Sequence, residues 1–209
     1  KDYPAFNIQD SIEEASEVAK DFGYSHVFIT KNGEFVGALS QAFLEESPDG
    51  SLESLEIHYE RFAILDDGNV LDSVKLFYVF NANIVPIINL HEKYLGYISC
   101  DDVFSEFSKY PLFSESGAVL TIQTQNLHYS FAEITKIVES NNSKIYGIYV
   151  SAINIDNIHI TMKISNENLT SIDETLERYG YTIVHKHYAD EKEELMIDRF
   201  GFFQKYLEV

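Results

Sequence analysis

The chain has 209 residues, of which 45% are hydrophobic and 14% aromatic, enough to build the cores of one or two globular domains. Its formal net charge of −19 disfavours nucleic acid and anionic membrane as partners, because both require clustered Lys and Arg. We expect neither a signal peptide nor a membrane-spanning run, and the single Cys100 cannot form an internal disulfide, which together favour the cytoplasm. Because the chain does not begin with Met, we expect a short native segment before Lys1.

An internal repeat organises the first half of the chain. The two copies align without a gap at an offset of 59 residues, so that Gly37 falls on Gly96, and Ile12, Ala15 and Val18 fall on Leu71, Val74 and Phe77. Each copy predicts a short entry strand, a helix with apolar residues three and four apart, a β-hairpin and a closing helix at about 41–46 or 100–108. The sequence therefore predicts a β-α-β-β-α unit that occurs twice.

Two local patterns refine this prediction. Asn32-Gly33 lies between apolar runs, which is a strong hairpin signal because both residue types tolerate positive φ. The segment 45–60 is rich in Glu, Ser and Asp, and we interpret it as an exposed connection between the copies. A single copy of the unit cannot cover its own sheet, so we expect the two copies to pack on each other.

The second copy resembles a CBS domain. Its strand Val85-Pro86-Ile87-Ile88 precedes Gly96-Tyr97-Ile98-Ser99-Cys100-Asp101-Asp102-Val103, which is similar to the family pattern of a hairpin that opens a helix with Ser-x-x-Asp. The first copy departs from this pattern, since Val27 replaces the Pro and Phe43 replaces the acid. CBS domains occur in pairs, as the duplication does, so the resemblance implies a CBS pair over about residues 4–110.

From Gly117 onward the pattern changes. Strands are predicted at 118–124, 144–154, 158–165 and 181–187, and helices at 130–142 and 170–179. Ser130 with Glu133 has the sequence of a capping box, and Gly180 is a natural residue to end the second helix. The order β-α-β-β-α-β is that of the ferredoxin-like fold.

After a CBS pair, such a domain resembles an ACT domain, although the stretch 125–129 lacks the Gly or Pro of the amino-acid-binding loop in that family. The fold class is thus α+β, with CBS repeat 1 and its acidic connector at 1–60, CBS repeat 2 at 61–113, the ACT-like domain at 114–188 and a C-terminal amphipathic helix at 189–209. The apolar stripe of that helix must dock on its own chain or on a partner chain. This layout is similar to that of the acetoin-utilisation regulatory proteins.

Ser99 and Asp102 are the main candidate ligand-binding residues. By the resemblance, Ser99 lies near a nucleotide phosphate, Asp102 binds the ribose hydroxyls, the backbone at Val85 and Pro86 reads the purine edge, and Ile84 packs on its face. A carboxylate can accept hydrogen bonds from a diol, and a helix N-terminus attracts phosphate. The alternative interpretation is purely structural, because Ser-x-x-Asp at a helix start is also a capping box. Phe43 cannot bind ribose, so the first-copy site is expected to be degenerate.

The remaining polar residues offer little chemistry. His159, His185 and His187 could share a sheet face, but without Cys companions we interpret them as surface histidines, and no metal site is predicted. Cys100 begins a helix, yet Asp101 and Asp102 beside it oppose thiol ionisation. No nucleophile motif, P-loop or zinc-protease helix occurs, so no catalytic residue is predicted and the chain is not expected to be an enzyme.

These observations lead to one functional hypothesis and one alternative. The hypothesis is a non-catalytic regulatory sensor that needs no cofactor, binds an adenine nucleotide of the AMP, ADP or ATP type or a related adenosine ligand in the CBS pair, and forms a homodimer. The alternative is a ligand-free module for dimerisation or partner docking. The degenerate first copy and the altered loop of the ACT-like domain favour the alternative.

Overall fold

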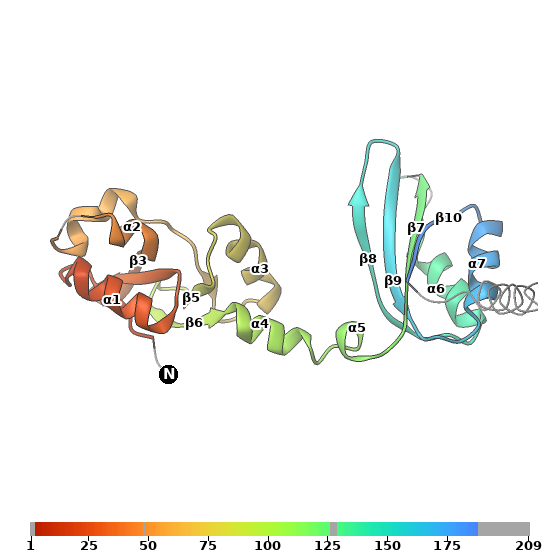
Figure 1. Cartoon of the computed structure of the whole chain (residues 1–209), viewed down its shortest axis with the longest axis horizontal. Coiled ribbons are helices and arrows are strands. Elements are labelled where there is room, and N and C mark those ends of the chain that lie inside the picture. The colour runs from red at the N-terminus through yellow and green to blue at the C-terminus, as the bar shows by residue number, and fades with distance from the viewer. Residues whose placement is uncertain (1–2, 48, 126–128, 188–209) are drawn as a thin grey trace, which may run out of the picture. The chain divides into compact units, whose positions relative to one another are not determined.

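The computed structural model describes residues 3–47, 49–125 and 129–187, and the predicted C-terminal helix lies outside these ranges. The chain divides into two compact units, with the boundary between Ser108 and Lys109. Both units mix small sheets with helices, as the predicted α+β class requires (Figure 1). Each unit is described separately below.

The first copy of the repeat forms a three-stranded sheet in the order β1-β2-β3, in which β1 is parallel to β2 and β3 is antiparallel to it. Its elements are β1 (Phe6–Asn7), α1 (Ile12–Phe22), β2 (His26–Lys31), β3 (Glu34–Ser40) and α2 (Gln41–Glu45). Asn32 and Gly33 have φ of 54° and 84°, so the predicted tight turn between β2 and β3 is confirmed. Gly23 ends α1 in the left-handed conformation that suits glycine.

The second copy has the same topology, with sheet order β4-β5-β6. Its elements are β4 (Ile64–Leu65), α3 (Val70–Val79), β5 (Ile84–Ile88), β6 (Tyr94–Ser99) and α4 (Cys100–Phe107). The buried apolar residues of both copies belong to one core, in which Phe28, Ile29 and Leu39 of the first copy lie with Ile84 and Val85 of the second. The two copies therefore pack on each other, as expected from a repeat that cannot cover its own sheet.

The strand register corrects the ungapped alignment of the copies. Phe6 pairs with Ile29, and Ile64 pairs with Ile87, which puts these parts of the copies 58 residues apart. Gly37 and Gly96 lie opposite Ile29 and Ile87, and these glycines are 59 residues apart. One residue is thus inserted in the turn of the second hairpin, so the offset of 59 is right after the turn and wrong before it.

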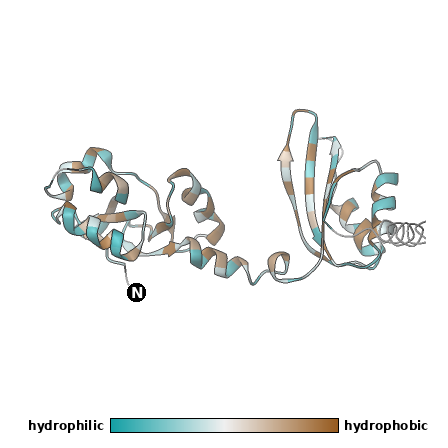
Figure 2. Ribbon diagram, in the orientation of Figure 1, coloured by the Kyte–Doolittle hydropathy of each residue, from teal (hydrophilic) through white to brown (hydrophobic). Residues whose placement is uncertain are grey.

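This one-residue shift also corrects the predicted core face of α3. The sequence alignment put Leu71 and Val74 on the core positions of α1, but both side chains are exposed. In the corrected register Ala15 of α1 corresponds to Ser73 of α3, and neither side chain has any exposed surface. The apolar residues of α3 therefore lie partly in the core and partly at the surface. Figure 2 shows the hydropathy of the residues along α1 and α3, with apolar residues in brown.

The connection between the copies is more ordered than the sequence suggested. It contains a 3-10 helix, η1 (Leu52–His58), in which Leu52 has no exposed surface and Leu55 is also buried. Glu60 then pairs with Ala38 at the edge of the first sheet, through hydrogen bonds from both backbone N–H groups. The acidic residues of this segment remain at the surface, but two leucines anchor it, so the prediction of a wholly exposed connection is wrong.

The second unit is a four-stranded antiparallel sheet in the order β10-β7-β9-β8, with two helices on one face (Figure 1). Numbered within the unit, the strand order is 4-1-3-2, the order of the ferredoxin-like fold that the element pattern predicted. Its elements are α5 (Pro111–Ser114), β7 (Ala118–Gln125), α6 (Phe131–Ser140), β8 (Ile145–Ile153), β9 (Asn157–Ile164), α7 (Leu169–Arg178) and β10 (Thr182–His187).

Alternating residues of the strands build the core of this unit. Ile158, Ile160 and Met162 of β9 point to the helical side, where they pack with Ile134 of α6 and Ile172 of α7. The turn after α7 follows the prediction, since Gly180 has φ of 86°.

The predicted capping box of α6 is only half formed. Ser130 Oγ accepts a hydrogen bond from the N–H of Glu133, but the Glu133 carboxylate accepts one from the hydroxyl of Tyr181 at 2.8 Å. The side chain of Glu133 thus contacts Tyr181, the residue just before β10, and links the start of α6 to the start of β10.

Candidate functional site

The predicted ligand residues Ser99 and Asp102 form a complete capping box at the start of α4. Ser99 Oγ accepts a hydrogen bond from the N–H of Asp102 at 3.1 Å, and Asp102 Oδ2 accepts one from the N–H of Ser99 at 2.9 Å. The Ser99 hydroxyl also donates to Asp102 Oδ2, at 2.6 Å. The capping interpretation is therefore realised, and both polar side chains stabilise the helix that carries them.

The same hydrogen bonds keep Asp102 ionised. Donation by the hydroxyl and by the backbone of Ser99 lowers the pKa of the Asp102 carboxyl, and burial opposes this only weakly because the side chain is exposed. The neighbouring thiol behaves in the opposite way, since burial and the charge of Asp101 raise the pKa of Cys100. The start of α4 thus presents an exposed carboxylate and a hydroxyl, but no activated nucleophile.

The predicted base-binding segment lies next to this cap. Ile84, Val85 and Pro86 on β5 pair with Ser99, Ile98 and Tyr97 on β6, so the hairpin brings all five candidate residues to one end of the sheet. The side chains of Ile84 and Val85 have no exposed surface. In this arrangement only the backbone of residues 84–86 can contact a ligand at this position. The buried side chain of Ile84 cannot pack on the face of a base in the way that the resemblance implied.

The first copy lacks the carboxylate at the equivalent position. Ser40 caps α2 by accepting a hydrogen bond from the N–H of Phe43 at 3.2 Å, just as Ser99 caps α4. The ring of Phe43 is half-buried, and its centroid lies 4.8 Å from that of His58. The copies therefore share the hydroxyl at the helix start and differ in the residue that could bind a diol.

A polar cluster between the copies was not predicted from the sequence. The N–H of Ser25 donates to Asn83 Oδ1 at 2.8 Å, and the N–H of Asn83 donates to Ser25 Oγ at 2.8 Å. Asn83 Nδ2 also donates to the carbonyl of Gly23, at 2.9 Å. In the corrected register Ser25 and Asn83 are equivalent residues, so this reciprocal pair marks an approximate two-fold axis between the copies. An offset of 59 does not align Ser25 with Asn83, whereas an offset of 58 does.

The cluster continues into a buried histidine. Ser25 Oγ lies 2.9 Å from His26 Nδ1, and His26 Nε2 lies 3.2 Å from a carboxylate oxygen of Glu60. Only the tautomer with hydrogen on Nε2 lets the serine hydroxyl donate to Nδ1 and the imidazole donate to the carboxylate. Burial lowers the pKa of His26, and the Glu60 carboxylate opposes this. The fold therefore favours the neutral imidazole, which links β2 to the connection between the copies.

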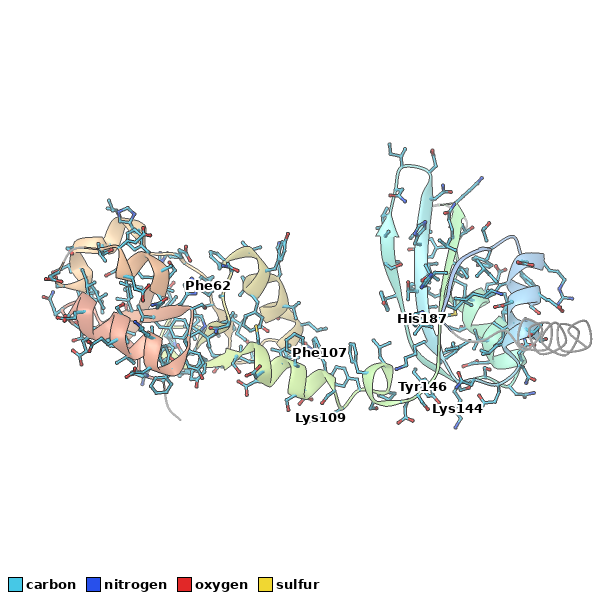
Figure 3. The ribbon with its side chains drawn as sticks, viewed as in Figure 1. Phe62, Phe107, Lys109, Lys144, Tyr146 and His187 are labelled. Carbon is cyan, nitrogen blue, oxygen red and sulfur yellow. The ribbon has the colours of Figure 1, made fainter. Side chains whose placement is uncertain are left out.

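Aromatic rings fill the space beside the two entry strands. The ring of Tyr3, which precedes β1, packs against that of Phe22 with the centroids 5.3 Å apart. The Tyr3 hydroxyl donates a hydrogen bond to the carbonyl of His26. Phe62, which precedes β4 and is labelled in Figure 3, stacks on Phe80 with ring centroids 4.2 Å apart. Both side chains are buried, and each also contacts a ring of the other copy, Tyr3 that of Tyr97 and Phe62 that of His26.

The second unit holds cavities but no metal centre among its described residues. One cavity of about 490 Å³ at the ends of β7 and β10 is lined by amide and hydroxyl groups, including those of Gln123, Asn157 and Thr182. The rings of His185 and His187 on β10 stack with their centroids 5.6 Å apart, and His159 Nε2 lies 3.0 Å from the side-chain oxygen of Gln123. Figure 3 labels His187. Within residues 3–47, 49–125 and 129–187, no group of three or more His, Cys, Asp or Glu could hold a metal ion, and no helix could cross a membrane.

The first unit contains the β-α-β-β-α arrangement twice, as the sequence resemblance to a CBS domain pair implied. No protein-family model and no curated protein matches this sequence. Similar solved structures include a CBS domain pair/ACT domain protein from Thermotoga maritima, with 15% identity and a TM-score of 0.46, covering 51% of this chain and 88% of that one. The CBS domains of a transcriptional regulator from Streptococcus pneumoniae have 15% identity and a TM-score of 0.43, covering 49% of this chain and 87% of that one. CBSX2 in complex with AMP has 14% identity and a TM-score of 0.40, covering 50% of this chain and 87% of that one.

Proposed function

We propose that this chain is a non-catalytic regulatory protein whose first unit binds an adenine nucleotide, or a related adenosine compound, at the second copy of the repeat. The observation that carries the proposal is the exposed carboxylate of Asp102, kept ionised beside a hydroxyl at the N-terminus of α4. A carboxylate in this state can accept two hydrogen bonds from the vicinal hydroxyls of a ribose. The net charge of −19 supports a small-molecule partner rather than nucleic acid or anionic membrane.

Binding would redistribute the hydrogen bonds of the cap. Asp102 Oδ2 already accepts two hydrogen bonds from Ser99, so a ribose diol would use Oδ1 or displace the Ser99 hydroxyl from Oδ2. A released Ser99 hydroxyl could donate to a phosphate, which the positive end of the helix dipole at the start of α4 would also attract. The cap therefore serves as the resting state of the proposed site.

The experiment is calorimetric titration of the full chain with AMP, using Asp102→Ala and Phe43→Ala as a matched pair. We expect Asp102→Ala to weaken AMP binding by roughly ten- to a hundredfold, as the loss of hydrogen bonds to a charged group implies. Phe43→Ala, at the equivalent position without a carboxylate, should leave the affinity nearly unchanged. No heat and no thermal shift with millimolar AMP, ADP or ATP, roughly the weakest affinity of regulatory use, would overturn the proposal.

A ligand-free module for dimerisation or partner docking is the second candidate function. The complete capping box and the full burial of Ile84 favour it, because both occupy groups that a nucleotide would need. In this case Asp102→Ala lowers the stability by about 1 kcal/mol, the usual effect of a lost helix cap, and there is no affinity to change. Thermal unfolding of the variant beside the titration separates the two candidates.

A further inference from the structure

The elements that carry the candidate residues are acidic. The first turn of α4 holds two carboxylates, Asp101 and Asp102, and no Lys or Arg occurs in β5, β6 or α4. Both aspartates are exposed, and the hydrogen bonds of the cap keep Asp102 ionised. Burial and the charge of Asp101 raise the pKa of the adjacent Cys100 thiol. The helix dipole supplies only about half a positive charge at this end, so the first turn of α4 is net negative.

The strand register places one basic residue, Arg61, at the same end of the second sheet. Continuing the parallel pair of β4 and β5 back from Ile64 puts Arg61 level with Ile84, and its side chain is exposed. Lys93 lies in the hairpin turn at the other end, and the strand from there to Ser99 spans about 20 Å. One guanidinium balances one of the two carboxylates, so a ligand at the start of α4 still meets a net negative surface.

The first copy shows that the fold does not require the charge of Asp101. At the start of α2, Ala42 occupies the equivalent position, and the first turn of α2 contains no acidic residue. Ala42 and Asp101 are both exposed, and the capping box of α4 uses Ser99 and Asp102 rather than Asp101. Neither capping nor core packing therefore explains the second carboxylate, whereas a role toward a ligand does.

We propose that Asp101 restricts the ligand of this site to adenosine compounds that carry at most one phosphate. This inference rests on the proposed function, in which Asp102 binds the ribose and the first phosphate lies near Ser99. The helix dipole and Arg61 favour one phosphate there. Each further phosphate adds negative charge close to Asp101. Repulsion between unit charges about 6 Å apart weakens binding by roughly threefold in water, and by about tenfold where water is partly excluded.

The test is calorimetric titration of the full chain with adenosine, AMP, ADP and ATP, in EDTA so that no divalent cation neutralises the phosphates. At about 0.1 M salt, where charges interact over about 10 Å, we expect the affinity to fall from AMP to ADP to ATP by roughly three- to tenfold at each step. Raising the salt to about 1 M shortens this range to about 3 Å and should bring the three affinities together. Adenosine is uncharged and should bind nearly equally at both salt concentrations.

Two variants remove the charge of Asp101. Asp101→Asn keeps the shape of the side chain, and Asp101→Ala gives the second copy the residue of the first. In both, we expect the ratio of AMP affinity to ATP affinity to fall by roughly threefold or more, with the adenosine affinity nearly unchanged. Glu92→Gln is the matched control, because it removes the same charge from the exposed hairpin turn, roughly 20 Å from Ser99, and should leave the ratio unchanged.

The outcomes separate this inference from the proposed function. If ATP binds the wild type as tightly as AMP without a divalent cation, the inference is overturned and the proposed function stands. An equal ratio of affinities in Asp101→Asn and Glu92→Gln overturns the role of Asp101. If none of the four compounds binds, the proposed function itself is overturned, and the inference with it.

Discussion

The reciprocal contact of Ser25 and Asn83 predicts how strongly the two copies depend on each other. Asn83→Ala removes the hydrogen bonds to the N–H of Ser25 and to the carbonyl of Gly23, at 2.8 and 2.9 Å. Each such bond contributes about 0.5–1.5 kcal/mol, and a half-buried donor left without a partner costs about 1 kcal/mol more. We therefore expect the free energy of unfolding to fall by roughly 2–4 kcal/mol, measured by urea denaturation.

The control is Gln9→Ala, which removes an exposed amide hydrogen bond to Glu53 and should cost about 0.5 kcal/mol or less. Hydrogen exchange gives a local readout, because the amide of Ser25 loses its acceptor in Asn83→Ala and should exchange faster than in Gln9→Ala. The reasoning is refuted if Asn83→Ala costs no more than Gln9→Ala, or if exchange at Ser25 is the same in both.

Two further predictions concern titratable groups. Because burial lowers the pKa of His26 from its ordinary 6.5, the fold favours the neutral imidazole, so this stabilisation is present above pH 6.5 and is lost as the pH falls through the lowered pKa. Unfolding free energies at pH 7 and pH 5 should therefore differ less in His26→Gln than in the wild type, and equal differences would contradict this. In the second unit, burial and the bond to Glu133 raise the pKa of Tyr181 to about 12. Tyr181→Phe should cost about 1 kcal/mol in thermal unfolding, against almost nothing for the exposed Tyr179→Phe.

Much of the fold could be predicted because local signals and the duplication agreed. The Asn32-Gly33 turn, the end of α7 at Gly180 and the β-α-β-β-α-β order of the second unit all depend on short-range patterns. The buried side of α3 could not be predicted in this way, because a single residue inserted in a surface turn moves every earlier equivalence by one position. Without the strand register, the sequence does not show whether Val74 or Ser73 occupies the position in the second copy that is equivalent to Ala15 in the first.

The hairpin that carries the candidate residues could be predicted from the sequence, but their roles could not. The sequence correctly brought Ile84 and Ser99 to one end of a hairpin, since antiparallel strands joined by a short turn place such residues opposite each other. It left the role of Asp102 open between ligand and cap, because the same spacing serves both. The contact of His26 with Glu60 joins residues 34 apart in the sequence, which no local pattern encodes. Nucleotide binding itself stays a prediction.

The reciprocal contact at the approximate two-fold axis also bears on how the duplicated unit can diverge. If both copies carried asparagine at this position, each amide oxygen could accept the other's backbone N–H, as Asn83 does for Ser25. The geometry of the axis therefore requires no difference between the copies, and an identical pair could assemble in the same way. The copies differ at the axis itself, where serine meets asparagine, and also in the hairpin turn and on exposed helix positions, so each half can acquire its own surface while the reciprocal contact is kept.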